Sequence, residues 1–378
     1  MSKKNNLLII NQHSSYITID IANAFADSRI YDKIVLMAGM VNVREVPLTN
    51  NIKVVKTIPY LKNNIFSRLF SWVTVFLHLL LVIYFKYRSY KVFMISNPPL
   101  ISFLPYFCRT KYSVLIFDVY PDALISNGFF TEDAFLSRLW EKANQRFYKK
   151  SEKVFTISAG MKESISKYCD KSKIEVVSLW SSFPPTLISK KDNEFVRQLN
   201  LGDKFIIMYS GNMGKELGLE IFLDVAQDLI YEKDFLFMFI GEGWHMPELI
   251  KQVKERSITN WMFLPYQSAS ILKHSLSAAD LSIVSLPSSN SLISIPNKVY
   301  TLLALARPMI CISDANSDLS RLVDEYDFGR VFGRFDVDKI VSFIQQCRSD
   351  HHFWNELSHN ALNCSEHFSK ENATLFVS

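Results

Sequence analysis

The sequence of 378 residues lacks the marks of a secreted or a zinc-binding protein. Its cysteines are odd in number, widely spaced and free of any Cys-x-x-Cys pair: Cys108, Cys169, Cys311, Cys347 and Cys364. This usage fits a reducing compartment and does not fit a zinc site. The apolar run Leu7 to Ile10 near the start is too short for a secretory signal and predicts a first β-strand. We therefore expect a cytoplasmic protein.

Acidic residues are absent from one long stretch. Between Pro47 and Phe117 there is no aspartate or glutamate, although the net charge of the chain is only +5. The stretch holds nine basic residues: Lys53, Lys56, Lys62, Arg68, Lys86, Arg88, Lys91, Arg109 and Lys111. No aromatic and basic platform or nucleic-acid motif accompanies them, so we do not expect a nucleic-acid partner.

Inside the acid-free stretch, the run Leu69 to Phe85 is almost wholly apolar. Three interpretations compete: a buried helix, a helix lying on an anionic membrane face, and a true membrane span. About 17 residues is the lower limit for a span, and strand-like sequence follows at once. A buried helix does not explain the missing acids. A helix at an anionic membrane surface explains both features.

The length and composition predict two domains of ordinary size. Hydrophobic residues make up 48% and charged residues 21% of a chain without low-complexity tracts or solenoid repeats. In the first half, strands at 7–11, 33–37, 92–96 and 113–117 alternate with helical patterns, which predicts a mainly parallel sheet covered on both faces. Pro184-Pro185 and the polar run Ser189 to Asn193 suit a linker. We expect domains at 1–185 and 186–358, with 359–378 a C-terminal helix packing back toward the first domain.

Three segments of the second half are built to hold an anion or a flat ring. The first, Met208 to Gly214, lies between a predicted strand at 204–209 and a predicted helix at 219–230. Glycine allows backbone N–H groups to approach phosphate oxygens, and a helix start adds partial positive charge. The plain alternative is that the glycines only make the turn.

The other two segments repeat and complete this arrangement. Phe239 to Gly243 again follows a predicted strand, at 235–240, and precedes a helical stretch from Pro247. Ile295 to Tyr300 supplies a cation, because Pro296 suits the first turn of a helix and Lys298 would lie in that turn. A point charge beside a helix start suits a diphosphate. The alternative for Lys298 is a solvated surface lysine.

The order and spacing of these segments resemble the nucleotide-binding domain of retaining GT-B glycosyltransferases of family four, in particular the bacterial surface-polysaccharide branch. The matching stretches are Tyr209 to Gly214, Gly218 to Glu220, Ile240 to Gly243, Ala278 to Ile283 and Ile295 to Ile310. The resemblance implies an α/β fold of GT-B architecture, with two Rossmann-like domains facing each other across a cleft.

The resemblance also implies roles for individual residues. Lys298 would neutralise the donor diphosphate, and Asp118 would contact the reacting sugar, although a helix cap or turn residue also explains Asp118. The implied donor-binding residues are Ser210, Gly211, Asn212, Met213, Lys215, Gly241, Gly243, Tyr266, Asn297 and Thr301. The implied acceptor-side residues are His13, Asn97 and Asp122.

The sequence departs from the family pattern at several of these positions. Two glutamates separated by seven residues are usual, yet the matching positions fall near Ile293 and at Thr301. Asn212 and Leu217 stand where basic residues are usual, so Lys215 and Lys298 are the remaining sources of phosphate-binding charge. The missing glutamates favour a non-catalytic glycosyltransferase-like subunit as an alternative, and a nucleotide-sugar epimerase is a further one.

We expect a retaining sugar transferase that uses a nucleotide-diphosphate sugar and needs neither a cofactor nor a metal. Asp336-Val337-Asp338 has the form of a metal-binding motif, but Asp336 is better explained as the N-cap of a helix with Asp338 in its first turn. The basic, apolar surface of the first domain suggests a lipid-linked acceptor. The expected setting is surface polysaccharide assembly, peripherally on the inner face of the cell membrane.

Overall fold

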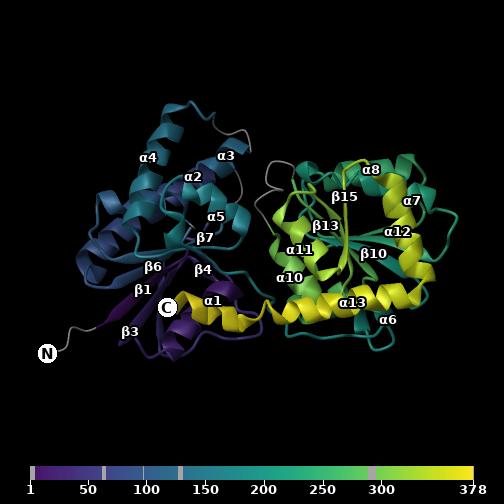
Figure 1. Cartoon of the computed structure of the whole chain (residues 1–378), viewed down its shortest axis with the longest axis horizontal. Helices are drawn as coiled ribbons and strands as arrows, with labels where there is room; N and C mark the ends of the chain where they lie inside the picture. The colour runs from purple at the N-terminus through teal and green to yellow at the C-terminus, as the bar shows by residue number, and fades with distance from the viewer. Residues whose placement is uncertain (1–4, 62–64, 97, 127–130, 288–294, 378) are drawn as a thin grey trace. The chain divides into compact units, whose positions relative to one another are not determined.

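The chain folds into two compact units. The computed structural model describes residues 5–61, 65–96, 98–126, 131–287 and 295–377. The first unit comprises Met1–Ser182 with Lys370–Ser378, and the second comprises Phe183–Ser369 (Figure 1). The sequence placed these divisions at 185/186 and 358/359. Residues 359–369 therefore belong with the second unit, because the helix that contains 359–366 packs on it.

The first unit is built on a seven-stranded sheet in the order β5-β3-β1-β6-β7-β8-β9. Every neighbouring pair in it is parallel. The strands are β1 (Asn6–Ile10), β3 (Lys33–Ala38), β5 (Ile52–Lys56), β6 (Lys91–Ile95), β7 (Tyr112–Ile116), β8 (Val154–Thr156) and β9 (Ile174–Val176), and β2 (His13–Ser14) pairs separately with β4 (Met40–Val41). Chain order reverses between β1 and β6, which makes this the topological switch point of the sheet.

The helices of the first unit connect these parallel strands. They are α1 (Tyr16–Asp27), α2 (Ile65–Val82), η1 (Ile83–Tyr87), η2 (Pro99–Tyr106), α3 (Asp122–Ser126), α4 (Phe135–Lys150), α5 (Ala159–Ser166) and η3 (Lys171–Lys173). The strands predicted at 7–11, 33–37, 92–96 and 113–117 lie within one residue of β1, β3, β6 and β7.

The end of the chain returns to the first unit. The segment η5 (Lys370–Val377) lies beside α1, as the yellow end of the ribbon shows (Figure 1). Phe376 is 2% exposed and packs edge-on against Phe93 and Phe155, at centroid distances of 6.0 Å and 5.0 Å. The last residues therefore complete the core of the first unit.

The second unit carries a six-stranded parallel sheet in the order β12-β11-β10-β13-β14-β15. The strands are β10 (Phe205–Ser210), β11 (Phe235–Ile240), β12 (Trp261–Leu264), β13 (Leu281–Ser285), β14 (Met309–Ile312) and β15 (Gly329–Phe332). Again the order reverses beside the first strand, here between β10 and β13. Ligands of such sheets bind beyond the carboxyl ends of the strands at this point.

Helices cover both faces of the second sheet. They are α6 (Glu194–Gln198), η4 (Lys215–Leu217), α7 (Ile221–Asp228), α8 (Met246–Glu255), α9 (Ala269–Ser277), α10 (Asn297–Ala304), α11 (Asp318–Tyr326), α12 (Val337–Ser349) and α13 (His351–Glu366). Ile207 and Tyr209 of β10 pack in the core cluster that contains α7 and α12, whereas Ile206 and Met208 pack with α6. This alternation follows the two-residue period of a strand.

Candidate functional site

The glycine-bearing loop after β10 lies at the switch point of the second sheet. Gly211 has φ +155°, a conformation that L side chains rarely adopt. A Cβ built on Gly211 would lie 2.8 Å from Nζ of Lys298, so the ammonium group lies directly over the glycine. Lys298 is the second residue of α10, which follows β13 on the other side of the switch point.

Lys298 has little within the protein to neutralise its charge. Its Nζ donates a hydrogen bond to the carbonyl oxygen of Ser210 at 3.1 Å and lies 4.2 Å from the ring centroid of Tyr209. Within the described ranges no carboxylate forms an ion pair with it. Desolvation by burial lowers the pKa of Lys298 to about 8. The site therefore holds a cation that an anionic ligand would stabilise.

The loops after β10 and β11 interlock through their backbones. Gly241 has φ +138°, and a Cβ there would lie 2.1 Å from the carbonyl oxygen of Gly211. The N–H of Gly211 donates to Ile240 O at 2.9 Å, and the N–H of Met213 donates to Glu242 O at 2.7 Å. Close packing of the two loops thus depends on glycine at 241.

The hydrogen bonds between the two loops change which backbone N–H groups can bind a phosphate, compared with the prediction from the sequence. The N–H groups of Gly211 and Met213 are already hydrogen-bonded, and the side chain of Met213 is fully buried in the core. In the described part of the chain, the N–H groups of Asn212 and Gly214 have no acceptor. These two remain available for an external anion. The helix start is also not adjacent, because η4 separates Gly211 from α7, which begins at Ile221 rather than 219.

The remaining predicted donor-side residues lie around the same two loops or on α10. Gly243 sits against Met213, since a Cβ there would lie 2.3 Å from Met213 O. The ring of Tyr266 lies against Gly241, 3.3 Å from the position of its missing Cβ, and its side chain is half exposed. Lys215 and Asn297 are exposed. Thr301 is buried within α10, where Lys298 lies one turn before it.

Three polar side chains that the sequence did not single out lie at this site: those of Arg334, His245 and Glu216. Arg334 donates to the carbonyl oxygens of Glu216 and Leu286, the latter at 2.9 Å, which ties η4 to the end of β13. His245, which precedes α8, lies 2.5 Å from a carboxylate oxygen of Glu220. The carboxylate of Glu216 itself covers Gly214, with an oxygen 2.3 Å from where a Cβ would stand. An anion bound near Gly214 would therefore lie close to this negative charge.

Asp118 lies two residues after β7 in the first unit. The N–H of Phe117 donates to Oγ of Ser96 at 2.9 Å, which fixes the turn that presents Asp118 at the carboxyl edge of the sheet. The Asp118 side chain keeps access to solvent, while desolvation by surrounding protein raises the pKa of its carboxyl group. Such a carboxyl can act on a polar ligand more readily than one neutralised by an ion pair.

Of the predicted acceptor-side residues, His13 and Asp122 share this edge of the first sheet but not one environment. His13 follows β1, and its Nε2 lies 3.5 Å from Nδ2 of Asn42. Asp122 begins α3 and is held by Lys167 at 2.7 Å, so its charge is already neutralised. Asn97 lies outside the described residues.

Asp336 has a structural role. It occupies the N-cap position of α12, as predicted, and accepts from the N–H of Gly333 at 2.7 Å. Its other oxygen accepts from Lys339 at 2.8 Å. The carboxylate thereby closes the turn before the helix.

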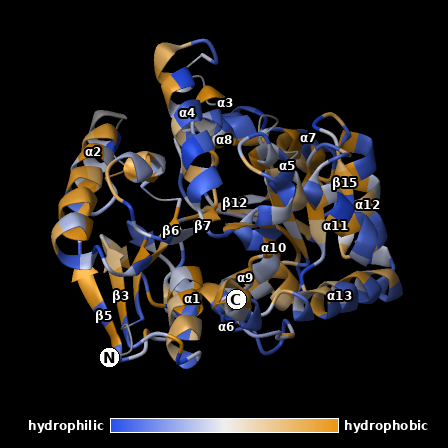
Figure 2. Ribbon diagram, turned by 60° about the vertical axis from the view of Figure 1, so that its left-hand side comes forward, coloured by the Kyte–Doolittle hydropathy of each residue, from blue (hydrophilic) through white to orange (hydrophobic). Residues whose placement is uncertain are grey.

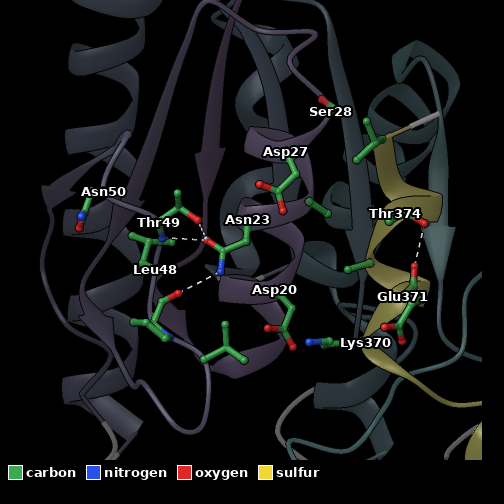
Figure 3. A pocket seen from close by; sticks show the side chains of 15 residues that line it. Asp20, Asn23, Asp27, Ser28, Leu48, Thr49, Asn50, Lys370, Glu371 and Thr374 are labelled. Carbon is green, nitrogen blue, oxygen red and sulfur yellow. Dashed lines mark hydrogen bonds between the residues drawn. The ribbon is translucent and has the colours of Figure 1, made fainter.

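A cavity of about 870 Å³ opens in the first unit beside the second half of α1 (Figure 3). Asn23 donates to Pro47 O at 3.0 Å and accepts from the N–H of Thr49 at 2.9 Å, so it holds the loop that forms one wall. The second half of α1 runs back toward the start of the strands. The cavity therefore lies at the edge of the sheet opposite to Asp118 and His13.

The apolar helix α2 is exposed along one side. Together with η1 it gives one segment, Ser67–Tyr87, long and apolar enough to cross a membrane, with a mean hydropathy of 1.9. Only 28% of the apolar 18-residue window within this segment is buried. Much of the α2 ribbon is coloured as hydrophobic in Figure 2.

Comparison with known proteins gives partial sequence matches. No family model matches the chain. WbjE of Pseudomonas aeruginosa, named a probable glycosyltransferase, is 24% identical over 243 residues, which cover 62% of this chain and 60% of WbjE. WcaI of Escherichia coli (strain K12), whose name describes a colanic acid biosynthesis glycosyl transferase, is 30% identical over 130 residues, covering 34% and 32%. The chain thus spans less than two thirds of either relative.

Solved structures match over nearly the whole chain. Alr3699/HepE of Anabaena in complex with UDP and glucose has a TM-score of 0.72 at 13% identity, covering 99% of this chain and 98% of that one. The lipopolysaccharide glycosyltransferase WaaG has a TM-score of 0.68 at 11% identity, covering 98% and 99%. The chain has the GT-B fold. The predicted α/β class with two parallel-sheet domains is confirmed.

Proposed function

We propose that the protein is a glycosyltransferase that moves a sugar from a nucleoside diphosphate sugar to an acceptor. The observation that carries this proposal is the ammonium group of Lys298 over Gly211, with no described carboxylate paired to it. As the glycosidic bond breaks, the leaving diphosphate gains about one negative charge. A fixed cation and oriented N–H groups stabilise this charge more strongly than the ground state.

The backbone donors at Asn212 and Gly214 supplement Lys298. Both lie on the loop after β10, and α10 begins next to the ammonium group, so its dipole adds positive potential. These groups can stabilise the leaving diphosphate without a metal or a cofactor, and we propose such a reaction. Complexes of the Anabaena protein with UDP and with UDP-glucose support a uridine diphosphate sugar as the donor class.

The reaction proposed is a transfer with retention of anomeric configuration, as in family four. In that scheme the acceptor attacks the face that the nucleotide leaves, and the departing phosphate takes the acceptor proton. No strong protein base is then required. Asp118, whose pKa is raised by desolvation, is suited to hydrogen-bond a sugar hydroxyl.

The acceptor proposed is a lipid-linked glycan in bacterial surface polysaccharide synthesis. The names of WcaI and WaaG, which refer to colanic acid and lipopolysaccharide biosynthesis, support this setting. The exposed apolar side of α2 and the acid-free basic stretch around it support a place on the inner face of the membrane. On this proposal the protein is cytoplasmic and binds the anionic membrane surface peripherally.

Thermal stabilisation by a panel of nucleoside diphosphates and nucleoside diphosphate sugars tests the proposed donor-binding site directly. A ligand present at 100 times its Kd adds about 2.7 kcal/mol to the free energy of unfolding. We expect stabilisation by at least one diphosphate and much less by the matching monophosphate, because Lys298 and the loop N–H groups face the second phosphate. Equal stabilisation by monophosphate and diphosphate would contradict this role. Turnover by the purified chain alone would exclude a non-catalytic subunit.

A further inference from the structure

Arg68, in the first turn of α2, carries a guanidinium group that has no hydrogen-bond or ion-pair partner among the described residues. Its Nε is buried and makes no hydrogen bond, and no carboxylate of a described residue pairs with the side chain. The surrounding acid-free stretch offers none along the sequence. Leaving a buried charged donor unsatisfied costs folding free energy, so such a residue is a candidate for binding a ligand.

The position of Arg68 directs it toward the carboxyl edge of the first sheet. Trp72 lies one helical turn further along the same face of α2 and is 3% exposed. Its ring packs against those of Tyr60 and Tyr120, at centroid distances of 6.5 Å and 5.9 Å. Tyr120 comes two residues after Asp118, so this aromatic cluster links Arg68 to the predicted acceptor side.

The charges of Arg68 and Asp118 act on the same two phenols. Burial raises the pKa of both Tyr60 and Tyr120. In each case the Arg68 charge opposes that rise in pKa and the Asp118 charge adds to it. The guanidinium and the carboxyl group therefore flank one cluster, although they form no ion pair with each other.

The opposite side of α2 is an apolar stripe with helical spacing. Its members are 47% to 77% exposed: Phe70, Val73, Leu77, Leu81, Tyr84 and Phe85. Phe107, which is 62% exposed, contacts Phe76 at 6.1 Å and widens the stripe. A stripe of this kind within a stretch rich in lysine and arginine matches a lipid surface with anionic headgroups.

We propose that Arg68 binds the phosphate of a lipid-linked acceptor while the apolar stripe of α2 lies in the hydrocarbon beside the lipid chain. The inference rests on the proposed function and adds the headgroup chemistry of its acceptor. A guanidinium binds phosphate through two parallel N–H···O bonds, which an ammonium cannot do. Arg68 precedes Phe70, the first member of the stripe, by two residues, so a lipid chain held along the stripe leaves its phosphate near the start of α2.

Vesicle binding by the intact protein, without nucleotide sugar, tests this role. The probes are phosphatidylcholine vesicles containing a small fraction of a long-chain prenyl phosphate or of the matching prenyl alcohol. We expect about tenfold tighter binding to the phosphate vesicles, because the contact is a charge-assisted hydrogen bond. Arg68→Ala should remove this preference, and Arg68→Lys should restore only part of it.

Arg88→Ala is the matched control, since Arg88 is an exposed arginine of the same acid-free stretch. It should change binding to both kinds of vesicle little and keep the preference for phosphate. Because the Arg68 side chain makes no hydrogen bond to a described residue, Arg68→Ala should not lower the melting temperature. A folded Arg68→Ala protein that keeps the preference, or an Arg88→Ala protein that loses as much of it, would overturn the proposal.

Two further experiments distinguish a lipid phosphate from free phosphate, and the role of Arg68 from the proposed transfer reaction. Inorganic phosphate at millimolar concentration should leave the preference intact; if it abolishes the preference, the site binds free phosphate and the lipid assignment fails. Lys298→Ala should bind both vesicles like the wild type. An inactive wild-type chain that still prefers prenyl phosphate would contradict the proposed transfer reaction and leave Arg68 in its role.

Discussion

The two sheets of this protein share one strand order around their switch points but end in loops of different chemistry. In the second unit the loops after β10 and β11 are held by backbone hydrogen bonds and close glycine contacts, with one ammonium group above them. In the first unit the corresponding edge carries side chains: Asp118, an aromatic cluster and Arg68. A common scaffold therefore does not assign a common ligand; the loops do.

The difference also separates two ways of recognising an anion. Backbone N–H groups bind any phosphate of the right geometry, so the second unit needs glycine at Gly211 and Gly241 more than it needs particular side chains. On the proposed function, the first unit relies on the length and charge of its side chains, which can vary with the acceptor. Substitutions should accordingly have distinct effects in the two units.

The largest effect should come from removing the ammonium group over the glycine loop. Lys298→Ala is expected to lower sugar-transfer turnover by about 100-fold or more, which is the usual cost of losing one oriented donor at a developing charge. Steady-state kinetics would measure it, with Lys254→Ala, an exposed lysine at the end of α8, as the control. Near-normal turnover in a folded Lys298→Ala protein would remove this residue from the mechanism.

The second-largest effect should come from the exposed apolar stripe of α2, which we propose contacts the membrane. Leu77→Gln, on the apolar stripe of α2, should weaken binding to anionic phosphatidylglycerol vesicles by about tenfold, because burying a leucine contributes about 1.5–3 kcal/mol. Leu187→Gln is the matched control, since Leu187 in the second unit is 55% exposed and Leu77 is 53% exposed. Co-sedimentation measures both, and the electrostatic part should weaken in high salt. Equal losses in the two variants would exclude α2 as the membrane contact.

The pH dependence of donor binding tests the charge of Lys298. The pKa of Lys298 is about 8 in the ligand-free protein, and a bound diphosphate should raise it by stabilising the ammonium form. The contribution of Lys298 to the affinity should therefore be constant below pH 8 and fall as the pH rises above it, by about tenfold per unit. Calorimetric titration with the diphosphate would show this fall, and Lys298→Ala should have a flatter profile. A wild-type affinity that rises between pH 8 and 9 would contradict it.

Much of the fold and part of the site could be predicted from the sequence. Apolar runs mark the buried parallel strands because both faces of each sheet are covered, and Pro296 marks the start of α10, so Gly211 and Lys298 could be assigned to one site. The sequence does not predict that the N–H groups of Gly211 and Met213 already donate hydrogen bonds within the protein, because these bonds depend on how two separate loops align. Arg334 reaches η4 from a distant part of the chain and leaves no local signal.

The smallest effect should come from Glu216, whose carboxylate covers Gly214. A diphosphate that accepts from the Gly214 N–H would lie close to this negative charge. Glu216→Gln keeps the shape of the side chain and removes the charge, so diphosphate binding should strengthen by about twofold, as expected for one exposed charge interaction. Glu248→Gln on α8 is a suitable control, because Glu248 is also exposed but lies outside the loops. If Glu216→Gln instead weakens binding, the carboxylate contributes to the donor site, and the backbone of the loop is not its main anion-binding element.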